Sequence, residues 1–377
     1  MTTQHKMIFK SASNMSDIKD ESIELVVTSP PYPMIEMWDE IFGLQNTEIQ
    51  SALESNNGSL AFELMNQELD KVWSELYRIV VPGGIVCINI GDATRTVDKN
   101  FQLFNSHSRI TYFMNKIGFQ SLPEILWRKQ TNAPNKFMGS GMLPPGAYVT
   151  LEHEFILVFR KGTKREFSIQ HSSLRRESAF FWEERNIWFS DVWDFKGTTQ
   201  KLKTENSRER SAAFPFDLAY RLVNMYSVKN DTVLDPFMGT GTTALAAICS
   251  QRNSIGYEID SNLKEEIFDK LLHSKDYLNK VIETRINNHI EFIQERIVEK
   301  GPTKYVNNIY GFPIVTNQEV ELFIKNIQSI SKNENDIVIS SYIDTPQLKI
   351  ELARNDLIKL DLINKEKKNK GLLVYLS

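Results

Sequence analysis

Cysteine is scarce in this chain, with only Cys87 and Cys249 among 377 residues. Both lie in apolar runs, so we interpret each as a small buried hydrophobic side chain rather than as a nucleophile. Two such residues exclude a disulfide framework and cannot form a thiolate zinc site. The sequence therefore predicts no metal centre.

Long hydrophobic runs are missing as well. No apolar stretch approaches the ~20 residues that span a bilayer, and residues 1–10 lack the apolar region of a signal peptide. We therefore expect a cytoplasmic protein with no membrane partner.

A large excess of either charge is also absent, because 44 Lys and Arg face 48 Asp and Glu, for a net charge of −4. This balance excludes a strongly basic nucleic-acid coat protein. Hydrophobic residues make up 41% of the chain and charged residues 24%, as in an ordinary globular protein. A length of 377 residues suits two domains, or one large α/β domain with insertions.

Apolar strand patterns alternate with helical patterns along most of the chain. Strands are predicted at residues 23–27, 85–90, 122–128, 154–159, 232–234 and 254–258, and helices at 66–80, 108–117, 216–227, 244–250 and much of 262–300. Pro82, Gly83 and Gly84 are predicted to separate a helix from the following strand. This alternation is typical of an α/β fold with a doubly wound, mostly parallel sheet. Residues 161–210 break the pattern, which indicates an insertion or a small separate lobe.

A glycine-rich turn follows the strand at residues 232–234. Gly239 and Gly241 let the backbone approach a ligand closely, and the helix after them begins with unpaired N–H groups. Glu258 closes the next strand, about 20 residues beyond the first glycine, a spacing that suits a carboxylate holding ribose hydroxyls. The pattern indicates a ligand at the carboxyl end of a parallel strand.

The same turn lacks what two nucleotide-binding motifs require. A dinucleotide-binding turn carries a third glycine where this chain has Ala244, and a phosphate-binding loop carries a lysine that is missing here. Asp235 and Phe237, just before the glycines, suit a cofactor with a positive centre and no phosphates. S-adenosylmethionine is such a cofactor.

A second turn, Thr28-Ser29-Pro30-Pro31-Tyr32, ends the strand at residues 23–27. Together with Asp235-Pro236-Phe237-Met238-Gly239-Thr240-Gly241-Thr242 it resembles the motifs of the DNA amino-methyltransferases, in the order of their beta class. Residues 76–84, 153–161 and 213–215 are similar to further segments of that family, so the resemblance covers roughly residues 7–275. It implies the S-adenosylmethionine-dependent methyltransferase fold with an inserted target-recognition region.

The resemblance also implies site residues. The base would be held by Ser29, Pro30, Pro31 and Tyr32, and the cofactor by Asp235, Pro236, Phe237, Gly239, Gly241, Thr242 and Glu258. An exocyclic amine is a poor nucleophile because its lone pair is delocalised into the ring. The Ser29 hydroxyl and the Pro30 carbonyl can accept its hydrogens, and the Tyr32 ring can stack on an extruded base. Without a Pro-Cys nucleophile, methylation at carbon 5 is excluded.

The first position of the motif bears on which base is modified. Within the family a serine there is commoner in cytosine-N4 enzymes, so Ser29 favours cytosine, and adenine-N6 stays open. A nucleotide-dependent oxidoreductase is disfavoured by the missing glycine, and a DNA-binding protein without catalysis by the intact Ser29–Tyr32 turn. RNA or protein substrates are not excluded, because a fold does not fix its substrate.

The expected partner is double-stranded DNA, with a cognate restriction endonuclease acting on the same site and no direct contact required. Monomer and dimer both stay open. Between Arg128 and Arg176 there are nine Lys or Arg and three Glu, which predicts a basic surface for DNA recognition. We divide the chain into a catalytic half (1–161), a target-recognition region (162–210), a cofactor-binding half (211–300) and an extension of open role (301–377).

Overall fold

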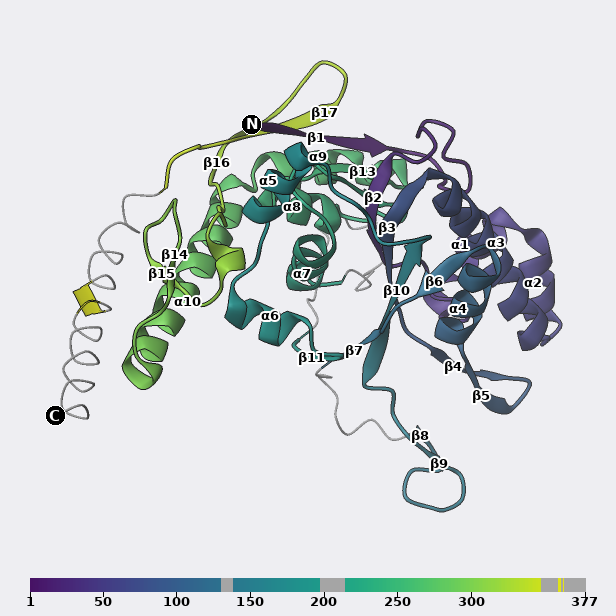
Figure 1. Cartoon of the computed structure of the whole chain (residues 1–377). Coiled ribbons are helices and arrows are strands. Elements are labelled where there is room, and N and C mark those ends of the chain that lie inside the picture. Colours follow the sequence, from purple (N-terminus) through teal and green to yellow (C-terminus); the bar gives the residue numbers. More distant parts are fainter. Residues whose placement is uncertain (130–137, 197–213, 347–358, 361, 363–377) are drawn as a thin grey trace.

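The computed structural model describes residues 1–129, 138–196, 214–346, 359, 360 and 362. Within these residues the centre of the molecule is an 11-stranded sheet with the order β11-β7-β10-β3-β2-β12-β13-β1-β17-β16, and β6 pairs with β10 (Figure 1). The strands are β1 (Thr2–Ile8), β2 (Ile23–Thr28), β3 (Val80–Ile90), β6 (Phe119–Ser121), β7 (Ile125–Arg128), β10 (His153–Lys161), β11 (Val192–Asp194), β12 (Thr232–Asp235), β13 (Asn253–Tyr257), β16 (Ile327–Lys332) and β17 (Ile337–Tyr342).

The middle of this sheet is parallel. Strands β3, β2, β12, β13 and β1 pair in parallel, whereas β10 runs antiparallel to β3, and β17 antiparallel to β1. The predicted mostly parallel sheet is confirmed. The carboxyl ends of β2, β3, β12 and β13 therefore share one edge, where open α/β sheets bind their ligands.

Helices cover both faces of the sheet (Figure 1). Successive side chains of β2 point to opposite faces of the sheet, so Leu25 and Val27 pack in one hydrophobic core and Val26 packs in the other. The first core includes α6 (Trp182–Trp188), α7 (Phe216–Tyr226), α8 (Thr242–Cys249), α9 (Lys264–Leu272) and α10 (Lys275–Lys300). The second includes α1 (Asp39–Gln45), α2 (Thr47–Glu54), α3 (Gly58–Ile79) and α4 (Ser106–Lys116). This doubly wound arrangement agrees with the predicted fold.

The segment Pro82-Gly83-Gly84 does not separate helix from strand as predicted. Helix α3 ends at Ile79, and β3 begins at once and includes these three residues. The pairing with β2 shifts register between Val80 and Ile85, so the segment forms an irregularity inside the strand. Gly83 has a φ of 81°, and a Cβ there would lie 2.5 Å from the backbone nitrogen of Arg165. Proline and glycine mark a bulge here.

The described part of the predicted target-recognition region joins the main fold. It contains α5 (Ile169–Glu177), α6 and β11. Strand β11 extends the sheet beside β7, and Trp193 on it is buried in the core. The rest of that region, residues 197–210, lies outside the described residues.

The extension at 301–377 completes the other end of the sheet. Strand β17 pairs with β1 and β16 pairs with β17, with Ile327, Val338 and Tyr342 buried in the core. None of the helices in the described part is both long enough and apolar enough to cross a membrane.

The remaining short strands and 3-10 helices lie outside the central sheet. They are β4 (Ala93–Val97), β5 (Asn100–Phe104), β8 (Met138–Gly139), β9 (Ala147–Tyr148), β14 (Tyr305–Val306), β15 (Pro313–Ile314), η1 (Glu36–Trp38), η2 (Ser261–Leu263) and η3 (Asn317–Glu319). The β4–β5 and β8–β9 hairpins lie toward the same end of the molecule in Figure 1.

Candidate active site

The two turns predicted from the sequence lie side by side. Strands β2 and β12 are parallel neighbours, so Thr28 and Asp235 reach the same edge of the sheet. The Thr28 hydroxyl donates a 2.6 Å hydrogen bond to Asp235 Oδ1. This bond joins the Ser29–Tyr32 turn to the glycine-rich turn across 207 positions of sequence.

The carboxylate of Asp235 is buried at this junction, with 2% of the residue exposed. Besides Thr28, it accepts hydrogen bonds from the Thr243 hydroxyl at 2.7 Å and from the Phe237 N–H at 3.1 Å. Burial raises the pKa of Asp235 to about 6, against the opposing effect of these hydrogen bonds. Asp235 therefore uses its oxygens to hold the two turns together.

The glycine-rich turn is open on its outer side. Gly239 and Gly241 have φ values of 52° and 80°, and a Cβ placed on Gly239 would meet nothing within 4 Å. Glu258 accepts hydrogen bonds from the N–H groups of Gly239 at 2.9 Å and Asp260 at 2.8 Å. A bound cofactor can thus approach the backbone at Gly239 with a carboxylate beside it.

An aromatic ring lies beside the open backbone of Gly239 and the Glu258 carboxylate. Phe237 is partly buried, and its ring meets Trp73 edge-on at a centroid distance of 6.0 Å. Pro236 is buried beside it. Open backbone, a neighbouring carboxylate and an aromatic face together fit a cofactor that carries an adenosine group and a positive centre.

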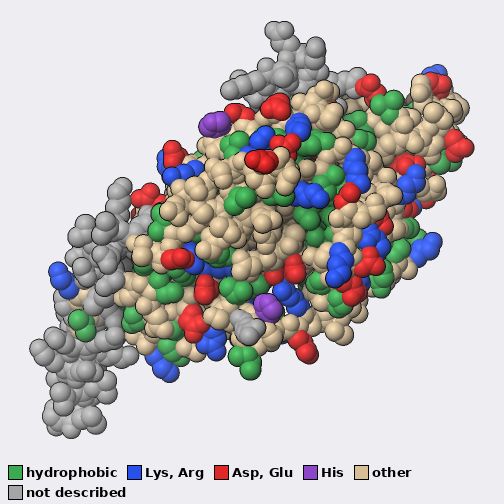
Figure 2. Space-filling view, turned by 90° about the horizontal axis from the view of Figure 1, so that it is seen from above, with side chains coloured by type: hydrophobic (Ala, Val, Ile, Leu, Met, Phe, Trp, Pro, Cys, Tyr) green, Lys and Arg blue, Asp and Glu red, His purple; other side chains and the backbone are tan. Residues whose placement is uncertain are grey.

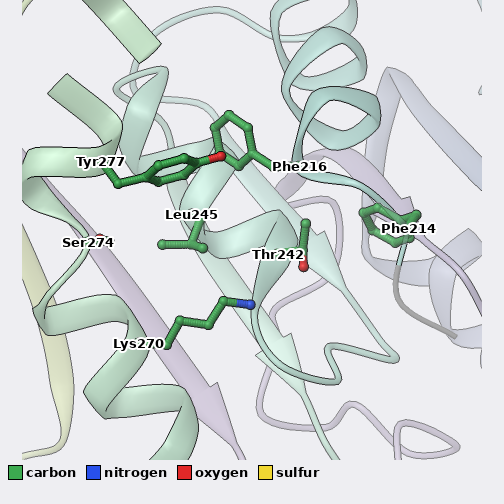
Figure 3. Close-up of a pocket in the computed structure, with 7 residues that line it drawn as sticks. All are labelled: Phe214, Phe216, Thr242, Leu245, Lys270, Ser274 and Tyr277. Atoms are coloured by element: carbon green, nitrogen blue, oxygen red, sulfur yellow. The ribbon is translucent and has the colours of Figure 1, made fainter. Parts of the chain in front are cut away.

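A cavity of about 360 Å³ lies beside the start of α8 (Figure 3). It is lined by Phe214, Phe216, Thr242, Leu245, Lys270, Ser274 and Tyr277. The Lys270 ammonium donates to the carbonyl and hydroxyl of Thr240, at 3.0 and 2.9 Å, and burial lowers its pKa to about 8. Of the predicted cofactor residues only Thr242 lines this cavity, and the buried Asp235 and Glu258 lie outside its lining.

The Ser29–Tyr32 turn contains a chain of hydroxyl groups. Ser29 Oγ donates to Tyr32 Oη at 3.2 Å, and Tyr32 Oη donates to Glu154 Oε2 at 2.9 Å. Pro30 is buried, and Pro31 is partly exposed. Because the Ser29 proton is directed to Tyr32, the lone pairs of the serine oxygen are left to accept hydrogen bonds.

Three residues outside the predicted set form a polar network around the Tyr32 hydroxyl. The Asn89 amide donates to Tyr32 Oη at 2.9 Å and to Glu154 Oε2 at 2.7 Å, and Lys129 forms an ion pair with Glu154. Burial and the Glu154 carboxylate raise the pKa of the Tyr32 hydroxyl. Polar residues inside apolar strands, Asn89 in β3 and Glu154 in β10, were the sequence signals for this network.

Comparison with known proteins identifies the family. The model of the family described as DNA methylase matches residues 23–269. The chain is 52% identical over 340 residues to the type II methyltransferase M.MthZI of Methanothermobacter thermautotrophicus, and the match covers 89% of this chain and 94% of that protein. The chain belongs to the DNA methylase family of amino-methyltransferases. The resemblance found in the sequence is confirmed.

Two further relatives support this membership. The type II methyltransferase M.MjaI of Methanocaldococcus jannaschii is 52% identical to the methylase over 282 residues, which cover 72% of this chain and 92% of that one. TTHA0409, a proposed DNA modification methylase of Thermus thermophilus, is 29% identical with a TM-score of 0.54, covering 73% of this chain and 93% of that chain. That crystal structure is a complex with S-adenosyl-L-methionine, the cofactor expected from the sequence.

The basic stretch of the methylase between Arg128 and Arg176 is divided between two edges of the sheet. Because β10 runs antiparallel to β3, Lys161 lies at the edge opposite the two turns, where it pairs with Glu21. Arg165 lies at that edge as well, paired with Asp231 just before β12 at 2.7 Å. The prediction of one basic recognition surface is therefore contradicted for Lys161 and Arg165, which lie away from the two turns.

The opposite edge carries mixed charge. Figure 2 views the molecule from above Figure 1 and shows Lys, Arg, Asp and Glu interspersed over the face turned to the viewer. Among the described cations of the stretch, Arg128 and Lys129 lie at the catalytic edge, at the end of β7. Lys136 lies outside the described residues.

A cluster of possible metal ligands also occurs away from the turns. Ligand atoms of Glu183, His289 and Glu319 lie within 4.8 Å of one another. His289 Nδ1 bonds Glu183 at 2.8 Å, while Glu319 accepts from the N–H groups of Trp182 at 3.0 Å and Thr316 at 2.6 Å. These bonds tie α6, α10 and η3 together, so the cluster has a structural explanation.

Proposed function

We propose that the methylase transfers a methyl group from S-adenosylmethionine to the exocyclic N4 of a cytosine flipped out of duplex DNA. The observation that carries this proposal is the hydrogen-bond chain from Ser29 through Tyr32 to Glu154. It leaves the Ser29 oxygen as an acceptor at the carboxyl edge of β2. An amine requires such an acceptor, because its hydrogens must be drawn out of the ring plane to free the nitrogen lone pair.

The residues of the two turns divide the work. Ser29 and the Pro30 carbonyl accept the amine hydrogens, and the ring of Tyr32, held by its hydroxyl, presents a face for the base. Gly239, Phe237 and Glu258 hold the methyl donor. When bound, S-adenosylmethionine would supply a methyl group on a positively charged sulfur: the amine nitrogen would bond to the methyl carbon as the carbon–sulfur bond breaks, the neutral thioether would leave, and the amine would lose one proton.

The bond between Thr28 and Asp235 supports the proposal from another direction. It fixes the base-binding turn against the cofactor-binding turn with a buried 2.6 Å contact. Transfer without a covalent enzyme intermediate depends mainly on such positioning of the two reactants. The geometry suits a reaction in which two bound molecules meet at the edge between β2 and β12.

Adenine N6 is the second candidate, because the same acceptor geometry serves any exocyclic amine. Serine at position 29 favours cytosine. M.MthZI and M.MjaI are described as type II methyltransferases, and we propose that this methylase likewise protects DNA from a restriction endonuclease with the same site.

The proposal is tested by identifying the product. Purified protein is incubated with unmethylated bacteriophage DNA and labelled S-adenosylmethionine, the DNA is digested to nucleosides, and the labelled nucleoside is identified by mass. We expect N4-methyldeoxycytidine. N6-methyldeoxyadenosine would favour the second candidate, and the absence of label in DNA despite cofactor binding would contradict methyl transfer to DNA.

A further inference from the structure

An exposed apolar tip projects from the methylase between β7 and β10. It belongs to the hairpin of β8 and β9, residues 138–149, which we call the 138–149 hairpin. Met142, Leu143 and Val149 are 85%, 72% and 83% exposed. Pro144 and Pro145 at the turn are exposed as well. An apolar cluster facing water on a soluble protein indicates a binding partner.

Charge is absent from this segment. The sequence from Phe137 to Leu151 contains no Asp, Glu, Lys or Arg, in a chain where charged residues make up 24%. Exposed turns are ordinarily polar, since loops run over the surface in contact with water. The uncharged 138–149 hairpin therefore suits a partner that offers apolar faces.

Contacts within the 138–149 hairpin and with β5 fix its conformation. The Ser140 N–H donates to the Gly146 carbonyl at 2.9 Å, which closes the loop at the tip. Gly139 has a φ of 69°, and a Cβ there would lie 2.1 Å from the Gly146 oxygen, so this position requires glycine. The Tyr148 ring stacks on Phe101 of β5 at 4.6 Å and 15°. A preformed tip loses little conformational entropy when it binds.

The root of the hairpin lies at the catalytic edge. His153, at the start of β10, pairs with Arg128 at the end of β7, and the next residue, Glu154, holds the Tyr32 hydroxyl. Figure 1 shows β8 and β9 extending beyond the body of the molecule at this end. At the root, Arg128 pairs with Glu152 and Asp194, and Lys129 pairs with Glu154. Their side chains are still 60% and 41% exposed, which leaves part of each cation open to phosphates beside the tip.

We propose that the tip of the 138–149 hairpin enters the DNA duplex and occupies the space left by the target base when that base moves to Ser29 and Tyr32. This rests on the proposed function. Extruding a base exposes the flat apolar faces of its neighbours in the stack, and apolar side chains inserted between base steps cover such faces. Met142 and Leu143, at the end of the tip, are the inserting residues.

The test compares paired and unpaired targets. The variant combines Met142→Ser with Leu143→Ser. The methylated site is first mapped on bacteriophage DNA and placed in a synthetic duplex, which is the paired substrate. The second substrate is the same duplex with an abasic residue opposite the target base. On the paired duplex we expect single-turnover methylation to fall about 10- to 100-fold, because the cost of opening the pair is no longer offset. On the abasic duplex we expect a rate within about threefold of the unmodified protein.

Controls separate this proposal from its alternatives. Val298→Ser, on α10 with Val298 68% exposed, removes an exposed apolar side chain elsewhere and should change neither rate. Met142→Ser alone, with an unchanged melting temperature, guards against misfolding of the double variant. Equal rates for the double variant and the unmodified protein on the paired duplex, or an equal loss on both duplexes, would overturn the proposal.

Two other outcomes are distinguishable. If the unmodified protein methylates no DNA, the proposed function fails, and the proposal for the hairpin, which rests on that function, fails with it. If the unmodified protein is a dimer on gel filtration without DNA, and the double variant is a monomer with unchanged methylation rates, the tip is a self-association surface and the proposal is wrong.

Discussion

At the scale of single residues, the hydroxyl of Tyr32 connects the predicted base-binding turn to the rest of the protein. It accepts from Ser29 and Asn89 and donates to Glu154. In the proposed function two roles are thus combined in one side chain, because the ring is proposed to offer a face for a base while the hydroxyl fixes both the ring and the serine proton. A substitution can separate them.

Tyr32→Phe keeps the ring and removes the hydroxyl. We expect the single-turnover rate of methylation to fall about 10-fold, because Asn89 and Glu154 lose a buried partner and the Ser29 proton is no longer directed away from the base. Tyr32→Ala should cost more, since the ring is lost as well. Cofactor binding, measured by calorimetry, should be unchanged in both, and a Tyr32→Phe enzyme as fast as the unmodified one would show that only the ring matters.

The raised pKa of Asp235 predicts a pH dependence of stability. Its pKa in the folded protein is about 6, against 3.8 for the ordinary group. The folded state therefore favours the protonated form, so this contribution to stability is full below pH ~4 and is lost as pH rises through ~6. Relative to Asp235→Asn, the free energy of unfolding should fall by about 3 kcal/mol over that range. Denaturant unfolding of both proteins checks this, and a difference that does not vary with pH would contradict it.

At the scale of elements, the turn between β12 and α8 depends on glycines with positive φ. Gly239→Ala places a methyl group in open space on the outer side of the turn, where the cofactor is proposed to approach. We expect the dissociation constant of S-adenosylmethionine to rise at least about 10-fold, with a strain cost near 1 kcal/mol in stability.

Gly162→Ala is the matched control, because Gly162 also has a positive φ, 62°, and nothing within 4 Å of its Cβ position. It should show a similar change in melting temperature with unchanged cofactor binding. Similar losses of cofactor binding in both variants would mean that backbone strain, and not the approach at Gly239, is responsible.

The elements that the sequence predicted are those with a strong local pattern. The apolar runs of β2, β10 and β12 and the turns that follow β2 and β12 are visible in the sequence alone. Strand β1 was missed because two of its inward residues, Thr3 and His5, are polar and paired with each other and with Ser254. Burial lowers the pKa of His5 to about 3, so it is neutral in this core.

The hydrogen-bond network around Tyr32 was not predicted from the sequence, for a related reason. Ser29 and Tyr32 lie three positions apart in one turn, whereas Asn89 comes from β3, Lys129 from the residue after β7, and Glu154 from β10. They meet because of the register between antiparallel strands, and a shift of one residue would turn each side chain to the other face. No local pattern in the sequence specifies that register.

At the scale of the whole molecule, the extension beyond residue 301 closes the edge of the sheet beside β1. Tyr342 bonds both Thr3 and the Ile248 carbonyl at 2.8 Å, and Ile327 is buried in the core shared with α7 and α10. The catalytic sheet and the extension therefore form one folding unit within the described residues.

Removing residues 327–377 should expose β1 as an unpaired edge. We expect the melting temperature to fall by at least about 10 °C, and the protein to aggregate on gel filtration, since an open edge pairs with other chains. A truncated protein that stays monomeric and melts at the original temperature would show that the extension is not needed to complete the sheet.

The account is tested most directly by comparing the products of the unmodified protein and Ser29→Ala on the same DNA. Mass analysis of the nucleosides should show N4-methyldeoxycytidine with the unmodified protein and at least about 100-fold less with the variant, because the acceptor for the amine is lost. Cofactor binding should stay the same. Equal methylation by Ser29→Ala would contradict the account, because the reaction would then not depend on the hydroxyl placed at the end of β2.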